Sequence, residues 1–146
     1  MHLSANSIGH LLESGSTPIS RLTYFYDEFL SHYIWFFGIN GLTALLIYRQ
    51  YKNPFEKTSK LTLEIIAGII YGVTFFITGI EGQTAPLSIP FALMVTLFGL
   101  IYGWGKLKTM PLLLFFLIAH ILALILFLIW GTYWGGLPQF SDLGLI

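Results

Sequence analysis

The chain has 146 residues, of which 55% are hydrophobic and 10% are charged, and its formal net charge is zero. A soluble domain carries about a quarter charged residues, so this chain lacks the polar surface needed to face water on all sides. The balanced charge gives no long-range attraction for nucleic acid, and the absence of cysteine excludes disulfides, thiolate metal sites and thiol catalysis. An integral membrane protein with the lipid bilayer as its main solvent is the class that these features favour.

Residues 1–20 are expected to form an N-terminal interfacial arm whose short helix cannot span a bilayer. A new helix is predicted to begin at Thr17 and Pro18, because Thr is a good N-cap and Pro is favoured at the first helical position. The first membrane span is predicted at about 29–48, and Asn53-Pro54 breaks the helix in the basic connector that follows.

Three further spans are predicted at about 61–80, 87–104 and 111–130, with short turns between them. The sequence therefore predicts an all-α integral membrane protein, in which residues 21–130 form an up-down bundle of four transmembrane helices after the short interfacial helix. Residues 131–146 are an expected irregular outer tail, for which a fold-back over the outer face and disorder are both open.

Basic residues give this bundle an expected orientation. Six of the seven lie in the two connectors after the first and third spans: Arg49, Lys52, Lys57, Lys60, Lys106 and Lys108. Because basic residues near span ends are retained in the cytoplasm, both termini are predicted on the non-cytoplasmic side.

Pairs of glycines one turn apart mark the second and third spans, at Gly68/Gly72 and Gly99/Gly103. Each pair gives a smooth helix face that a neighbouring backbone can approach closely. Packing within the chain is the favoured interpretation, and a homo-oligomer through either face is the alternative.

A polar residue in the middle of an apolar span is the main candidate for chemistry. His120 lies nine residues beyond Pro111, about 14 Å along a helix, and an ionisable group at that depth usually faces the bundle interior. On the first span, Glu28 and His32 are spaced i,i+4, and Asn40 lies two turns below His32 on the same face. The ordinary interpretation of His120 is a structural hydrogen bond to Asn40, a threonine or a carbonyl.

Imidazoles and carboxylates are expected to converge on the outer half of the bundle. They suit a divalent ion such as Zn, Fe, Mn or Cu. The predicted metal ligands are His10, His32, Glu81 and His120. Asp27 or Glu28 would be the general base, for hydrolytic or oxidative chemistry on a lipid-soluble substrate.

This inventory resembles that of the alkaline ceramidase-like family of intramembrane hydrolases, which bind zinc near one membrane face. The likeness is carried by three histidines, one aspartate and a serine: His10, His32, His120, Asp27, and Ser31 or Ser14. It covers residue types only, because the number of spans and the order of the motifs differ.

Three other functions fit the same residues. A non-enzymatic structural or accessory subunit would pack on other membrane subunits and use His120 as a core residue. Haem b could be held by His32 and His120 across two helices. A channel or transporter lined by Glu28, His32, Asn40 and Glu81 would require an oligomer.

Overall fold

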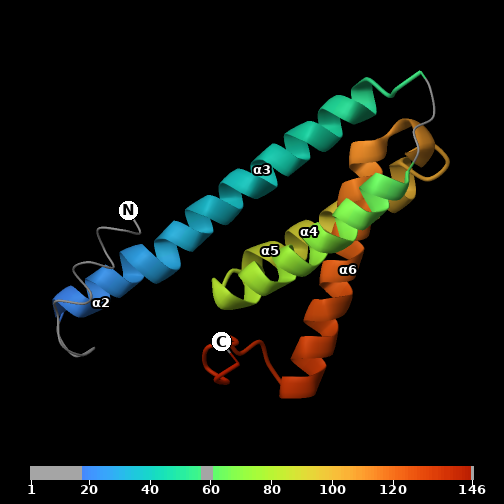
Figure 1. The fold of residues 1–146 in the computed structure, drawn as a ribbon. Coiled ribbons are helices and arrows are strands. Elements are labelled where there is room, and N and C mark those ends of the chain that lie inside the picture. Colours follow the sequence, from blue (N-terminus) through green and yellow to red (C-terminus); the bar gives the residue numbers. More distant parts are fainter. Residues whose placement is uncertain (1–17, 57–60, 146) are drawn as a thin grey trace.

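The computed structural model describes residues 18–56 and 61–145, and it is helical throughout with short connections (Figure 1). In chain order, the elements are α2 (Pro18–Tyr24), the π-helix η1 (Phe25–Leu30), α3 (Ser31–Lys52), α4 (Thr62–Glu81), α5 (Ala85–Tyr102), the 3₁₀ helix η2 (Leu107–Thr109) and α6 (Pro111–Trp134). The all-α class is therefore confirmed for this part of the chain. The predicted interfacial arm lies, up to residue 17, outside the described residues.

The first three elements form one long rod that begins at Pro18 (Figure 1). Its middle section, η1, is a π-helix, and the wider turn of a π-helix moves each side chain off the face that α-helical spacing assigns to it. Glu28 belongs to this section and His32 lies just beyond it, so the helix type changes between the two residues. Nothing in the sequence indicates this change of helix type.

Among the described residues, three helices are long and apolar enough to cross a membrane: α4, α5 and α6. Helix α3 is long enough at 22 residues but carries more polar side chains, and it is not one of the three. Three such helices indicate an integral membrane protein.

The helix ends follow from local chemistry. A turn at 82–84 separates α4 from α5, with Gln83 at a φ of 52°. Pro111 stands in the first turn of α6, where its missing N–H has no partner to lose. Gly135 ends α6 at a φ of 67°, the left-handed conformation that glycine adopts without strain. Helix α6 thus extends four residues beyond the predicted end of the fourth span.

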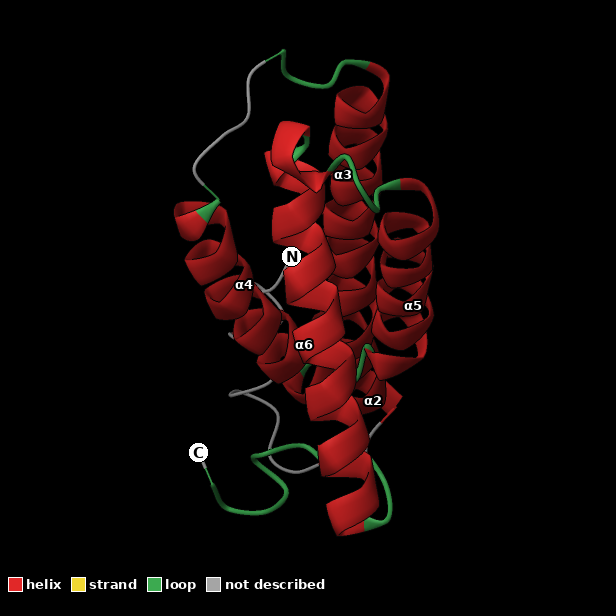
Figure 2. Cartoon of the chain, turned by 90° about the vertical axis from the view of Figure 1, so that its right-hand side faces the viewer, coloured by secondary structure: helices red, strands yellow, loops and turns green. Residues whose placement is uncertain are grey.

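Helix α6 is central, because α4, α5 and α3 all pack on it, α4 most extensively and α3 least (Figure 2). A Cβ atom on Gly72 would lie 2.5 Å from the Ala119 carbonyl oxygen, and one on Gly68 would lie 2.8 Å from that of Phe115. On α5, a Cβ on Gly99 would lie 2.7 Å from a methyl carbon of Leu117. These glycines therefore permit close packing within the chain, and a homo-oligomer through their faces stays a prediction.

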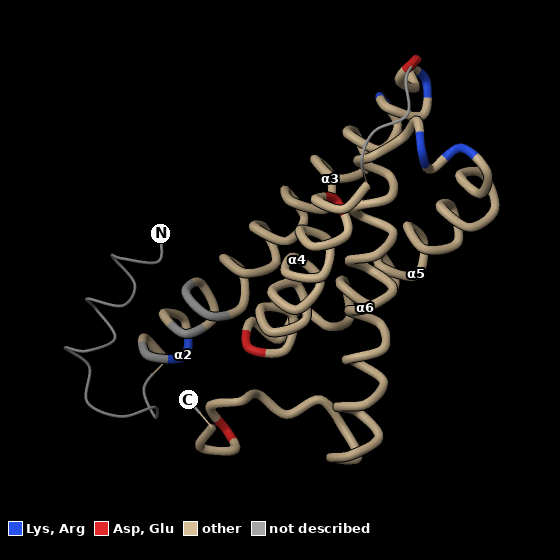
Figure 3. Tube along the Cα trace, turned by 45° about the vertical axis from the view of Figure 1, so that its right-hand side comes forward, with Lys and Arg blue, Asp and Glu red and all other residues tan. Residues whose placement is uncertain are grey.

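The two basic connectors lie together at one end of the bundle (Figure 3). The Phe55 N–H donates to the Thr109 carbonyl oxygen at 2.9 Å, which ties the two connectors to each other. Lys52 and Lys106 lie over the rings of Tyr48 and Tyr51, each at 5.8 Å from the ring centroid. Lys57 and Lys60 lie outside the described residues.

Candidate functional site

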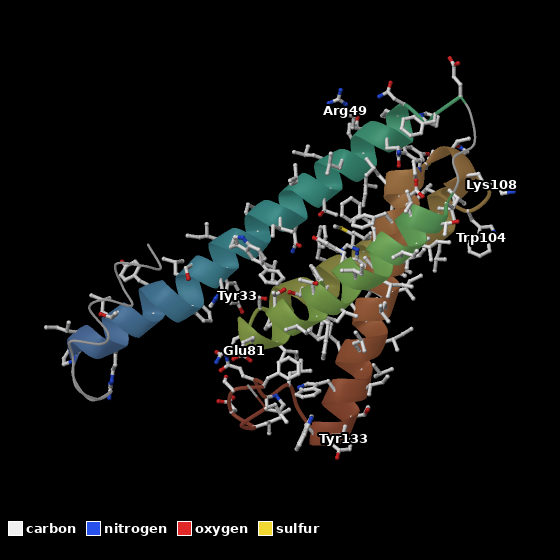
Figure 4. The ribbon with its side chains drawn as sticks, in the orientation of Figure 1. Tyr33, Arg49, Glu81, Trp104, Lys108 and Tyr133 are labelled. Carbon is white, nitrogen blue, oxygen red and sulfur yellow. The ribbon has the colours of Figure 1, made fainter. Side chains whose placement is uncertain are left out.

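The polar groups that the sequence singles out are divided between two places, the bundle end opposite the basic connectors and the level of His120. At the bundle end, Glu81 ends α4 and lies beside the C-terminal tail (Figure 4). Its Oε2 accepts hydrogen bonds from the N–H groups of Phe140, at 2.9 Å, and Ser141, at 3.5 Å. The carboxylate therefore holds a turn of the tail.

Further hydrogen bonds fasten the tail at the same end. The Gln139 amide donates to the Glu81 carbonyl and accepts from Gln83 at 2.6 Å. The Trp130 indole N–H donates to the Pro138 carbonyl at 3.0 Å, and the Tyr33 hydroxyl donates to the Gln83 carbonyl at 3.3 Å (Figure 4). Of the two open expectations for the tail, the fold-back is the one observed. We refer to residues 137–145 held in this way as the tail clasp.

His32 lies at this end as well. A Cβ on Gly82, the residue after Glu81, would lie 3.3 Å from His32 Cγ. Asp27 and Glu28 belong to η1, but the positions of their side chains lie outside the described part of the structure. His10 lies in the undescribed arm.

His120 lies in the middle of α6, with only 1% of its surface exposed. Its Nδ1 is 2.6 Å from the Phe116 carbonyl oxygen one turn earlier, and its Nε2 is buried with no hydrogen-bond partner. The ring packs against aromatic rings, with centroid distances of 5.0 Å to Phe75 and 5.5 Å to Phe91. The predicted carbonyl bond is present, and it uses one of the two ring nitrogens.

The contacts of α6 fix which residues share the depth of His120. Gly99 faces Leu117 and Gly103 faces Leu113, so α5 runs antiparallel to α6 and Thr96 lies level with His120. The Gln50 side-chain oxygen accepts from the Leu113 N–H at 2.9 Å. Thr43 lies seven residues before Gln50 on α3, and His120 lies seven residues after Leu113 on α6. Because the two helices run in opposite directions, Thr43 is level with His120, and Asn40 is about one turn away.

Each of the four long helices thus contributes polar side chains within about one turn of the depth of His120: Asn40 and Thr43 from α3, Tyr71 from α4, Thr96 from α5 and His120 from α6. We call these five residues the polar layer. The side chains of Tyr71 and Thr43 lie close to each other, whereas the amide of Asn40, the hydroxyl of Thr96 and Nε2 of His120 have no partner.

His32 and His120, two of the three histidines of the predicted metal site, are not brought together. The same alignment of α3 with α6 places His32 level with about residue 131, some eleven residues or ~16 Å along the axis from His120. Within residues 18–56 and 61–145, no three histidine or acidic side chains form a group that could hold a metal ion. With His10, Asp27 and Glu28 undescribed, the metal and catalytic assignments stay predictions. A haem b held by His32 and His120 would need both imidazoles at one depth.

Sequence reasoning missed Thr96 and Gln50 as partners in this arrangement. A signal for Gln50 was present, because buried positions recur every three or four residues along α3: Phe36, Asn40, Thr43, Ile47 and Gln50. Extending the polar stripe from Thr43 by two turns reaches Gln50.

Comparison with protein families, curated proteins and solved structures finds no match to this chain. Its function is therefore inferred from the geometry of the described residues alone.

Proposed function

We propose that this chain is a four-span membrane protein, with α3 as the first span and both termini on the non-cytoplasmic side, that serves as a non-catalytic accessory subunit of a larger membrane assembly. Helix α3 supports the span count because it lies along the same bundle as α5 and α6 and is 22 residues long, about 33 Å. That length matches the hydrocarbon core of a bilayer.

The observation that carries the accessory role is a pair of open glycines on α3. A Cβ atom on Gly38 or Gly41 would meet nothing within 4 Å, whereas Gly68, Gly72 and Gly99 all press against α6. Both glycines are exposed, and Ala44 continues this strip of small residues at the next turn. The strip serves no packing within the described part of the chain.

Glycine in a helix interior costs about 0.5–1 kcal/mol relative to alanine, so two open glycines are a disadvantage to α3 alone. In a bilayer, a strip of small residues lets a second helix approach closely, where dispersion contacts replace the missing hydrophobic drive. Trp35 and Leu45, both more than half exposed, flank this strip and would pack against the sides of the second helix. A helix from another membrane protein is the proposed occupant.

The proposal is tested by site-specific photo-crosslinking in native membranes. A benzophenone amino acid at Leu42, beside the glycine pair, is expected to give one discrete adduct with another protein. The double change Gly38→Leu and Gly41→Leu should abolish that adduct without lowering the melting temperature of the isolated chain, because the added side chains enter open space and leucine favours a helix more than glycine does.

Val73→Leu is the matched control, because it adds bulk to an exposed position on α4 and should leave the adduct intact. An adduct at twice the mass of the chain would identify a second copy instead of another subunit. That result, or the absence of any adduct, would contradict the accessory role.

A further inference from the structure

The polar layer contains three side chains whose hydrogen-bonding groups are unused, which is unusual for groups buried this deeply. Asn40 is 5% exposed, Thr96 is 9% exposed and His120 is 1% exposed. The two amide atoms of Asn40, the hydroxyl of Thr96 and Nε2 of His120 are all buried without a partner. They come from three helices, with Thr96 level with His120 and Asn40 about one turn away, so a small molecule between these helices can serve them.

The hydrogen bond at Nδ1 decides what His120 can receive. A carbonyl oxygen only accepts hydrogen bonds, so Nδ1 must carry the proton that it donates to Phe116. In the neutral imidazole, Nε2 is then a bare acceptor, and only a donor can satisfy it. The Asn40 amide offers the complementary pair, an N–H donor and a carbonyl acceptor.

Thr96 differs from four other threonines within the helices. Thr23, Thr74, Thr78 and Thr132 all donate to the carbonyl oxygen four residues earlier, at 2.8–3.0 Å. That bond is the usual way for a helical threonine to satisfy itself in apolar surroundings. The Thr96 hydroxyl makes no such bond, and it remains available to a ligand.

We propose that Asn40, Thr96 and His120 form a binding site inside the bundle for a neutral hydroxyl group. The hydroxyl donates to Nε2 of His120 and accepts from the Asn40 amide or the Thr96 hydroxyl. It is supplied by a water molecule or by a lipid-soluble alcohol or phenol, since these share the same donor and acceptor chemistry.

The packing around the site suits a guest of this kind. Two apolar clusters fill the core, one toward each end, and the rings of Tyr71 and Phe91 pack against both clusters and against His120. Aromatic rings therefore surround the His120 side of the site. Helix α3, which supplies Asn40, packs on α6 less extensively than α4 does, so the seam along α3 is the expected entry.

The proposal is tested by ¹⁵N NMR of the full-length chain labelled at histidine, in detergent micelles, with the His120 signals assigned by their loss in His120→Gln. The expected Nε2 resonance is that of an unprotonated nitrogen accepting a hydrogen bond. Thr96→Val and Asn40→Leu should shift it toward the position of a free lone pair, whereas Thr74→Val, the matched control outside the layer, should not.

Two added probes then distinguish the sources. Duroquinol carries two hydroxyl groups, and durene is the same methylated ring without oxygen. A shift with duroquinol but not with durene assigns the site to lipid-soluble phenols, and a bonded Nε2 that neither probe alters assigns it to water. A free lone pair or a protonated Nε2 in every sample of the unmodified chain would overturn the proposal, and this result requires no variant to fold.

Discussion

A glycine in this chain has opposite consequences depending on the helix that carries it. On α4 and α5, the missing side chain lets α6 approach to a distance that no Cβ atom tolerates. On α3, the same residue type leaves open space. The spacing of the glycines is visible in the sequence, but which of them are covered depends on contacts with residues about 20–50 positions away.

This difference predicts opposite effects of one substitution on stability. Gly72→Ala should lower the free energy of unfolding by about 1–3 kcal/mol, because its Cβ would lie 2.5 Å from the backbone oxygen of Ala119, which cannot rotate away. Gly38→Ala should raise it by about 0.5–1 kcal/mol through helix propensity alone. Thermal unfolding of both variants in one detergent measures the difference, and equal shifts would contradict the close packing of α4 on α6.

At the scale of elements, the helices were more predictable than the tail. Hydrophobic length, Pro111 and the glycine turns place α4, α5 and α6 within a few residues of their observed bounds. The tail clasp depends on hydrogen bonds between residues 56–60 positions apart, such as Glu81 with Phe140, and no local pattern encodes them. Gly135 does encode the change of direction, through its left-handed backbone.

The clasp gives Glu81 a testable structural role. Glu81→Ala removes the acceptor of two backbone N–H groups and should free residues 137–145, at a cost of about 1–3 kcal/mol, since hydrogen bonds to a charged group are among the stronger ones. Hydrogen–deuterium exchange should rise across the tail and stay unchanged in α4. Asp142→Asn is the control, because Asp142 holds only the exposed N–H of Gln139. Exchange that rises equally in both variants would show that Glu81 does not hold the tail.

At the same scale, the predicted convergence of His32 and His120 illustrates what residue counting alone can show. Counting from Pro111 places His120 near the middle of its helix, and the structure agrees. Counting along the first span does not give its alignment with α6, which is set by the Gln50 contact with Leu113. The polar stripe of α3 thus predicted a buried face correctly, but it gave no indication of which residue of α6 that face would meet.

The whole molecule has two chemically different ends. Arg49 and Lys108 lie at one end and Glu81 lies at the other (Figure 4). Lys52, Lys106 and Glu56 belong to the connectors at the first end, and Asp142 belongs to the tail clasp beside Glu81. In a membrane, such an asymmetry orients the chain, because segments rich in lysine and arginine resist translocation. The number of crossings then decides on which side each terminus lies.

The absence of cysteine makes this arrangement directly measurable, because one introduced cysteine is the only thiol in the chain. Arg21→Cys, Lys108→Cys and Gly136→Cys place a thiol before α3, between α5 and α6, and after α6, all at exposed positions. With four spans, a membrane-impermeant maleimide applied to intact cells should label positions 21 and 136, and it should label position 108 only after the membrane is opened.

The pattern at position 21 decides whether α3 crosses. If only α4, α5 and α6 span the bilayer, residues 21 and 52 lie on the same side. A Lys52→Cys variant would then give the same labelling result as position 21 and the opposite result to position 136. With α3 crossing, position 52 joins position 108 in being protected. Because each variant differs from the others by the place of one exposed thiol, the labelling of positions 21 and 52 reports the crossing of α3 without reference to any function.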